Sequence, residues 1–128
     1  MTIKNLSLDR DSFAVVTTRP KARQLLVELT GCADIRVQSE LGTLIHRIHE
    51  DARLMNANLV YVNMEKLEFL SSGCFKGLCT WARLLLSNEA GYDIRILTNP
   101  KYHWQARSLH ALQQLAPQRI SLELIDKK

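Results

Sequence analysis

The chain has 128 residues, of which 46% are hydrophobic and 23% charged, and its formal net charge is +4 at pH 7. This composition is typical of a globular protein and excludes a disordered or fibrous chain. A domain of this length buries about two thirds of the surface of its unfolded chain, so one hydrophobic core is enough to fold it. We therefore expect one domain over residues 1–128.

Two patterns set the first strands and the first helix. Residues 13–18 and 24–30 are rich in β-branched and apolar side chains, and the proline and charges of residues 19–23 between them suit a turn. These segments predict a hairpin. From Val37 the apolar residues recur at helical spacing, which predicts an amphipathic helix on one face of the sheet. Its apolar stripe consists of Val37, Leu41, Leu44, Ile45, Ile48 and Ala52.

The middle of the chain alternates a strand with a second helix. Residues 58–64 are apolar enough for a central strand buried on both faces. A Ser-Ser-Gly turn follows at residues 71–73, and the next apolar stripe predicts a helix that ends near residues 87–91. The members of this stripe are Phe75, Leu78, Cys79, Ala82, Leu85 and Leu86.

The last third predicts a strand, a helix and a strand. Residues 92–98 form the strand, Asn99 is the expected N-cap and Pro100 the first helical residue. The helix is carried by Ala106, Leu109, Leu112 and Leu115, and residues 119–125 form the closing strand. The order ββαβαβαβ predicts an α/β domain whose helix-linked strands run parallel through right-handed crossovers, with the first strand as an added edge.

Composition also limits the location and the ligands. No apolar run approaches the roughly 20 residues of a membrane span, and the first residues lack the apolar segment of a secretory signal. The three cysteines have no metal-finger spacing, so we expect reduced thiols in the cytoplasm and no cofactor. The basic residues are scattered, which argues against a nucleic-acid partner. His46 and His49 lie three apart without an HExxH pattern, so we expect a solvated pair and no metal.

The turn at residues 70–73 reads Leu-Ser-Ser-Gly and joins a strand to a helix. A serine N-cap accounts for one of the two serines. The pattern as a whole resembles the STAS domains of bacterial anti-sigma factor antagonists, whose Asp-Ser-Ser/Thr-Gly turn carries a serine phosphorylated by a partner-switching kinase. Gly31 and Asp34 match a Gly-x-x-Asp segment of the family, and residues 91–100 match its glycine turn, strand and helix start. The resemblance covers residues 13–100.

This resemblance implies a STAS-like mixed sheet, mostly parallel with an antiparallel edge hairpin, covered by about three helices. It implies a non-enzymatic domain that binds an anti-sigma factor or a kinase of the histidine-kinase ATPase fold, in a partner-switching system that regulates transcription. The phosphorylated position corresponds to Ser71, with Ser72 as a second acceptor, and Asp34 belongs to the binding surface. Leu70 replaces the usual acidic residue. This departure favours the alternative, a STAS subunit of an ABC-type lipid transport complex that docks on its ATPase without a phosphate.

The helix after the turn offers a docking flank. Trp81 and Leu84 follow the spacing of a partly exposed face, and interfaces favour tryptophan and apolar anchors. We expect Gly73, Lys76, Thr80, Trp81 and Leu84 to border the partner site. In the alternative, Trp81 packs under a neighbouring loop or a second subunit, and a homodimer is left open. A small enzyme acting through Cys74, a thiol near a helix start, is the remaining alternative; no histidine is paired with that cysteine in the sequence.

Overall fold

The computed structural model describes residues 2–87 and 91–125 and contains a six-stranded sheet in the order β1 to β6. The elements in chain order are β1 (Leu8–Arg10), β2 (Phe13–Thr18), β3 (Gln24–Ala33), the 3₁₀ turn η2 (Ile35–Val37), α1 (Gln38–Leu54), β4 (Leu59–Leu70), α2 (Ser72–Ser87), β5 (Asp93–Thr98), α3 (His103–Leu115) and β6 (Ile120–Leu124), with a further 3₁₀ turn η1 (Lys4–Leu6) before β1. Strands β1 to β3 pair antiparallel, and β3 to β6 pair parallel. The expected mixed α/β fold, with a mostly parallel sheet and an antiparallel edge hairpin, is confirmed.

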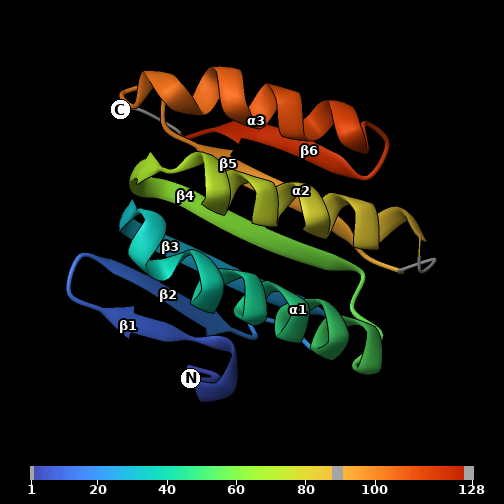
Figure 1. Ribbon diagram of the computed structural model, residues 1–128. Helices are drawn as coiled ribbons and strands as arrows, with labels where there is room; N and C mark the ends of the chain where they lie inside the picture. The colour runs from blue at the N-terminus through green and yellow to red at the C-terminus, as the bar shows by residue number, and fades with distance from the viewer. Residues whose placement is uncertain (1, 88–90, 126–128) are drawn as a thin grey trace.

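All three helices cover the same face of the sheet (Figure 1). Each parallel strand is added on the same side of the previous one, and right-handed crossovers then place every connecting helix on one face. Along β4 the burial therefore alternates, with Val60 and Val62 buried and Tyr61 and Asn63 half-buried. The expectation that this strand is buried on both faces is wrong, because no described helix lies behind it.

The hairpin of β2 and β3 and the apolar stripe of α1 form as expected, and all six residues of the stripe are buried. One strand was not foreseen: β1, three residues long, pairs antiparallel with β2 through Leu8 and Val15. It displaces β2 from the edge of the sheet. A strand this short leaves too little alternation in the sequence to be recognised.

Helix α3 begins later than expected. Asn99 is not its N-cap; the Asn99 side chain accepts from the backbone N–H of Lys101 at 3.0 Å and forms a turn that delays the helix to His103. The core-facing stripe shifts with it. Ala106 and Leu115 are exposed, whereas the polar Gln105 joins Leu109 and Leu112 in the core.

The carboxyl half of β4 extends past its neighbour. Its pairing with β5 ends at Asn63, and beyond that residue the side chains of Asn99 and of the first turn of α3 bind carbonyl oxygens of β4. The bonds run from Gln105 Nε2 to the carbonyl oxygens of Met64 and Leu67 at 2.7 and 3.0 Å, from Asn99 Nδ2 to that of Glu65 at 2.8 Å, and from Trp104 Nε1 to that of Glu68 at 2.8 Å.

Among the described residues, no helix combines the length and the apolar character needed to cross a membrane.

Candidate functional site

The candidate site lies where β3 and β4 end and the chain leaves the sheet for the helices. Neighbouring parallel strands finish at the same edge, so the segments that follow them meet there. The backbone N–H of Ser71 donates to the carbonyl of Ala33 at 2.8 Å and ties the two strand ends together. Asp34 and Ser71 belong to two motifs that carry the family resemblance. These motifs are far apart in the sequence, and the fold brings them side by side.

Ser71 is the N-cap of α2. Its Oγ accepts from the backbone N–H of Cys74 at 3.2 Å, and its carbonyl accepts the first intrahelical bond, from Phe75, at 2.9 Å. Ser71 is half-buried and Ser72 is exposed. The cap bond uses a lone pair of the Ser71 oxygen, so the hydroxyl hydrogen can still bond to an incoming group.

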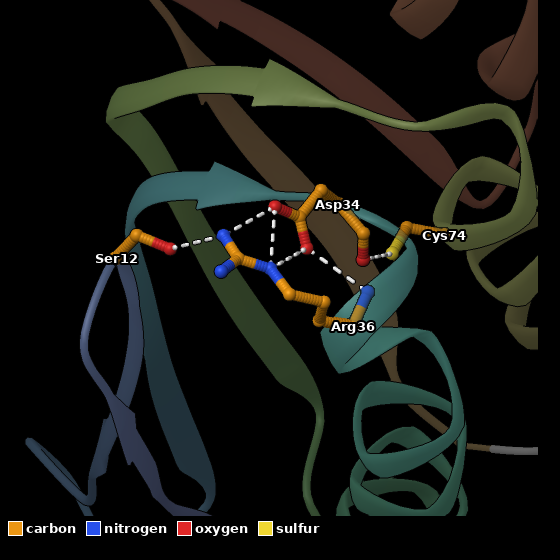
Figure 2. Close-up of polar contacts among 4 residues, drawn as sticks. All are labelled: Ser12, Asp34, Arg36 and Cys74. Carbon is orange, nitrogen blue, oxygen red and sulfur yellow. Dashed lines mark hydrogen bonds and ion pairs between the residues drawn. The ribbon is translucent and has the colours of Figure 1, made fainter.

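Asp34 forms an ion pair beside this turn (Figure 2). Its Oδ1 accepts from the backbone N–H of Arg36 at 2.9 Å, and its Oδ2 lies 2.7 Å from Arg36 Nη2. These bonds lower the pKa of the Asp34 carboxyl. Because the Arg36 side chain is 73% exposed, water screens the pair, and we assign it a positioning role and little stabilisation.

Asp34 also contacts the serine turn. Its carbonyl oxygen accepts from the thiol of Cys74 at 3.5 Å, while Arg36 Nη2 donates to Ser12 Oγ at 3.3 Å (Figure 2). Three segments therefore meet at Asp34: the β1–β2 turn, the β3–α1 connection and the first turn of α2.

Gly31 allows this meeting. Its φ is +96°, a conformation that side chains disfavour, and a Cβ on this residue would lie 2.2 Å from the backbone oxygen of Ser12. The neighbouring Cys32 N–H donates to that same oxygen at 2.8 Å. The glycine of the Gly-x-x-Asp segment thus holds the β1–β2 turn against the site.

An open groove of about 620 Å³ runs between α1 and α2 next to the serines. Gly42, Gly73 and Gly77 line it, and Ile35, 78% exposed, stands beside it. Phe69, two residues before Ser71, is 49% exposed. The sequence analysis did not single out these two large apolar residues. Their positions in the chain were the available signal, since Ile35 directly follows Asp34 and Phe69 precedes Ser71 by two residues.

The expected docking flank is only partly available. Lys76 is exposed, and Thr80 and Leu84 are half-buried. Trp81 is 4% exposed, so its expected exposure is wrong. It packs inside the protein against Tyr92 in the segment before β5, as the alternative interpretation had it. Leu86, expected in the core, is instead 51% exposed.

A buried polar chain explains the position of Trp81. Trp81 Nε1 donates to the hydroxyl of Tyr92 at 2.8 Å, and the same oxygen lies 2.6 Å from His49 Nδ1. An indole can only donate, so the Tyr92 hydrogen is available to Nδ1. Burial raises the pKa of Tyr92 to about 12 and lowers the pKa of His49. His49 Nε2 is buried without a hydrogen-bond partner among the described residues.

Metal binding and thiol catalysis find little support in this geometry. His46 is exposed and His49 is 2% exposed, so the expectation of a solvated histidine pair is wrong for His49, and the two rings lie in different surroundings. Within residues 2–87 and 91–125, no three His, Cys, Asp or Glu side chains are grouped to hold a metal ion. Burial raises the pKa of the Cys74 thiol, the opposite of what an activated nucleophile needs.

Comparisons with known proteins place the fold. No family model matches the sequence, and no curated protein matches it. Among solved structures, the phosphorylated form of the Bacillus cell fate determinant SpoIIAA is 16% identical, with a TM-score of 0.59 over 88% of this chain and 92% of that chain. An anti-sigma factor antagonist from Mycobacterium paratuberculosis is 17% identical, with a TM-score of 0.61 over 93% and 90% of the two chains.

A further similar chain comes from the complex of the diguanylate cyclase SiaD with its activator SiaC from Pseudomonas aeruginosa. It is 8% identical, with a TM-score of 0.60 over 93% of this chain and 98% of that chain. At such identities the likeness shows a shared fold. The chain has the STAS-like fold of the anti-sigma factor antagonists, as the resemblance implied.

Proposed function

We propose that this chain is a non-catalytic regulatory domain that binds a protein partner at the β4–α2 turn and releases it when Ser71 is phosphorylated. The observation that carries the proposal is the Ser71 hydroxyl at the start of α2, with the exposed Phe69 two residues before it and the exposed Ile35 on the groove that Gly73 also lines. Apolar side chains left in water beside a polar group are typical of a contact surface. The partner we expect is an anti-sigma factor or kinase of the histidine-kinase ATPase fold, in the cytoplasm.

The physical basis of release is local. A phosphate on Ser71 adds about −1.5 to −2 charges at the N-terminus of α2, where the helix dipole and free N–H groups favour an anion by about 0.3–1 kcal/mol. The domain therefore stays folded when it is modified. The partner instead meets a bulky anion that must be desolvated, which is unfavourable unless the partner supplies a cation. Ser72, which is exposed, is the second acceptor to examine.

The test compares four proteins immobilised on beads: wild type, Ser71→Ala, Ser71→Asp and the distant control Ser121→Asp. Ser121 is exposed on β6, so its substitution adds the same charge away from the site. Each is incubated with lysate of the source organism, once without and once with added ATP, and retained proteins and phosphopeptides are identified by mass spectrometry. Without ATP, we expect one partner of the histidine-kinase fold to be held by all but Ser71→Asp. With ATP, we expect phosphate to appear on Ser71 of wild type and Ser121→Asp, which then release the partner, whereas Ser71→Ala retains it.

The proposal fails if no retained protein distinguishes Ser71→Asp from Ser71→Ala. Loss of the cap in Ser71→Ala costs about 1 kcal/mol, so both variants are first shown to be folded by circular dichroism.

One observation favours a second candidate. Leu70, half-buried, stands where antagonists carry an acidic residue, and a kinase that reads this carboxylate would not recognise the turn. The same surface would then dock on the ATPase of an ABC-type lipid transport complex. In that case Ser71 stays unmodified, and the retained proteins are an ATPase and its permease.

A further inference from the structure

The charges on the helical face are segregated. The sequence has no Asp or Glu from residue 71 to 88 or from residue 99 to 122, whereas α1 carries charges of both signs. Four exposed cations lie in these two stretches: Lys76 and Arg83 on α2, Lys101 before α3, and Arg107 on α3. Helices α2 and α3 lie side by side on the covered face of the sheet (Figure 1). We call these four residues the cationic face.

The cationic face has no internal counter-charge. Within residues 2–87 and 91–125, none of its four side chains forms an ion pair. Five of the eight arginines elsewhere do, whereas Arg19, Arg23 and Arg47 are in none of these pairs. The pairs are Arg10 with Glu40, Arg36 with Asp34, Arg53 with Glu50, Arg95 with Glu123 and Arg119 with Asp93. Lys101 Nζ lies 5.7 Å from the centre of the Tyr102 ring, but an aromatic ring carries no net charge and does not neutralise the ammonium group. The cations of this face are therefore free to pair with carboxylates from outside.

The cationic face continues the candidate site. Lys76 lies five residues after Ser71, and Arg83 is seven residues, or about two turns and 10 Å, further along the same helix. The start of α3 approaches the same end of β4, because Trp104 Nε1 donates to the carbonyl of Glu68. The exposed Glu68 marks the border of the face. A partner that covers Ser71 and extends along α2 meets these charges.

We infer that the partner presents an acidic protein surface to α2 and α3. This inference rests on the proposed function and adds the chemistry of the partner to it. Opposite charges across an interface raise the association rate and select the partner. A protein surface fits better than nucleic acid, because the exposed neighbours are the apolar Ile35, Phe69 and Leu86. The indole of Trp81 is buried and that of Trp104 is partly buried against the core, so neither offers a fully exposed stacking platform for bases.

An acidic partner also gives the phosphate its effect. A phosphate on Ser71 has the same sign as the partner and lies at the end of the cationic face, five residues before Lys76 in the chain. Charges closer than the Debye length, about 8 Å at physiological ionic strength, interact with little screening by salt. The phosphate would therefore repel the partner and reduce the positive potential that attracts it. Release then needs no change of conformation in the domain.

The experiment reverses charge in pairs: Lys76→Glu with Arg83→Glu, and Lys101→Glu with Arg107→Glu. The matched control is Lys4→Glu with Lys21→Glu, two exposed lysines outside α2 and α3. All variants change the net charge equally, and equal melting curves show that they fold. The first probe is the protein that distinguishes the Ser71 variants on the beads. We expect each reversal on the face to weaken its binding about tenfold, mostly through a slower and less salt-dependent association, with less than about a twofold change in the control.

The second probe needs no identified partner. An oligoglutamate peptide is titrated into the wild-type protein at low salt and its contacts are mapped by NMR, beside a DNA duplex and phosphatidylglycerol vesicles of equal charge. We expect oligoglutamate shifts on α2 and α3 that the reversals remove and the control keeps.

The outcomes separate the two proposals. A captured partner that binds all variants alike overturns the acidic-surface inference and leaves the proposed function intact. Capture of no discriminating protein overturns the proposed function, and the oligoglutamate map then decides on the cationic face alone. Shifts centred on other cations overturn the inference, and so does tighter binding of the duplex or the vesicles than of the peptide.

Discussion

Replacing Gly31 by alanine tests whether this residue holds the candidate site together. The new Cβ would lie 2.2 Å from the backbone oxygen of Ser12, and φ is +96°. A side chain at such a φ costs about 1–2 kcal/mol. The overlap is with backbone, so it can be relieved only by moving the β1–β2 turn, which breaks the Cys32–Ser12 bond at a cost of about 1 kcal/mol. We expect a loss of about 2–4 kcal/mol.

Gly42→Ala is the matched control. Nothing lies within 4 Å of a Cβ at this position inside α1. Alanine has the higher helix propensity and restricts the unfolded chain, so we expect a gain of about 0.5–1 kcal/mol in the free energy of unfolding. Identical chemistry at two glycines should thus change stability in opposite directions.

Urea unfolding followed by circular dichroism measures both variants. With an m-value of about 2 kcal/mol per M, the Gly31→Ala midpoint should fall by about 1–2 M and the Gly42→Ala midpoint should rise slightly. A Gly31→Ala midpoint equal to that of wild type would refute the reasoning, since it would mean that the β1–β2 turn is not held by this glycine.

Three further predictions concern the buried polar groups. Tyr92→Phe removes the oxygen shared by the indole and imidazole nitrogens, and thermal melting should show a loss of about 2–4 kcal/mol. Because burial lowers the pKa of His49, the unfolded chain takes up its proton first; the free energy of unfolding should be constant above about pH 6.5 and fall as the pH falls towards the folded-state value, as urea curves at several pH values can show. Gln105→Leu leaves three backbone groups unpaired and should cost about 3 kcal/mol by urea unfolding.

Each of these predictions has a control. His49→Gln should flatten the pH dependence, whereas the exposed His46→Gln should keep it; equal slopes in both would contradict the assignment. Gln114→Leu on the exposed side of α3 should leave the urea midpoint of the protein nearly unchanged. A Tyr92→Phe protein as stable as wild type would mean that its hydroxyl bonds contribute nothing net.

The sequence predicted the order of strands and helices because apolar periodicity is a local property. The stripe of α1 and the hairpin of β2 and β3 could be recognised within windows of about 11 to 18 residues. Ser71 could be placed at a helix start for the same reason, since its cap bond reaches only to Cys74. That it binds a partner, or is phosphorylated, stays a prediction.

Features that depend on distant segments were missed. The exposure of Trp81 was misjudged because its hydrogen-bond partner, Tyr92, belongs to the next strand connection, and His49 completes the chain from another helix. Gln105 is outside the predicted apolar stripe of α3, and it is buried because its amide binds carbonyl oxygens of the distant strand β4. The face of β4 opposite the helices is uncovered because of the order of the strands in the sheet, and this order cannot be inferred from periodicity alone.

The overhang of β4 restricts how a partner can approach. An extended strand with free carbonyl and amide groups invites another chain to pair with it, and many peptide-binding domains use such an edge. Here the edge nearest the serine turn is already closed by the amide side chains of Gln105 and Asn99 and by the indole of Trp104. Recognition by strand addition is therefore blocked at this position, and a partner must instead recognise the shape and charge of the helix surfaces.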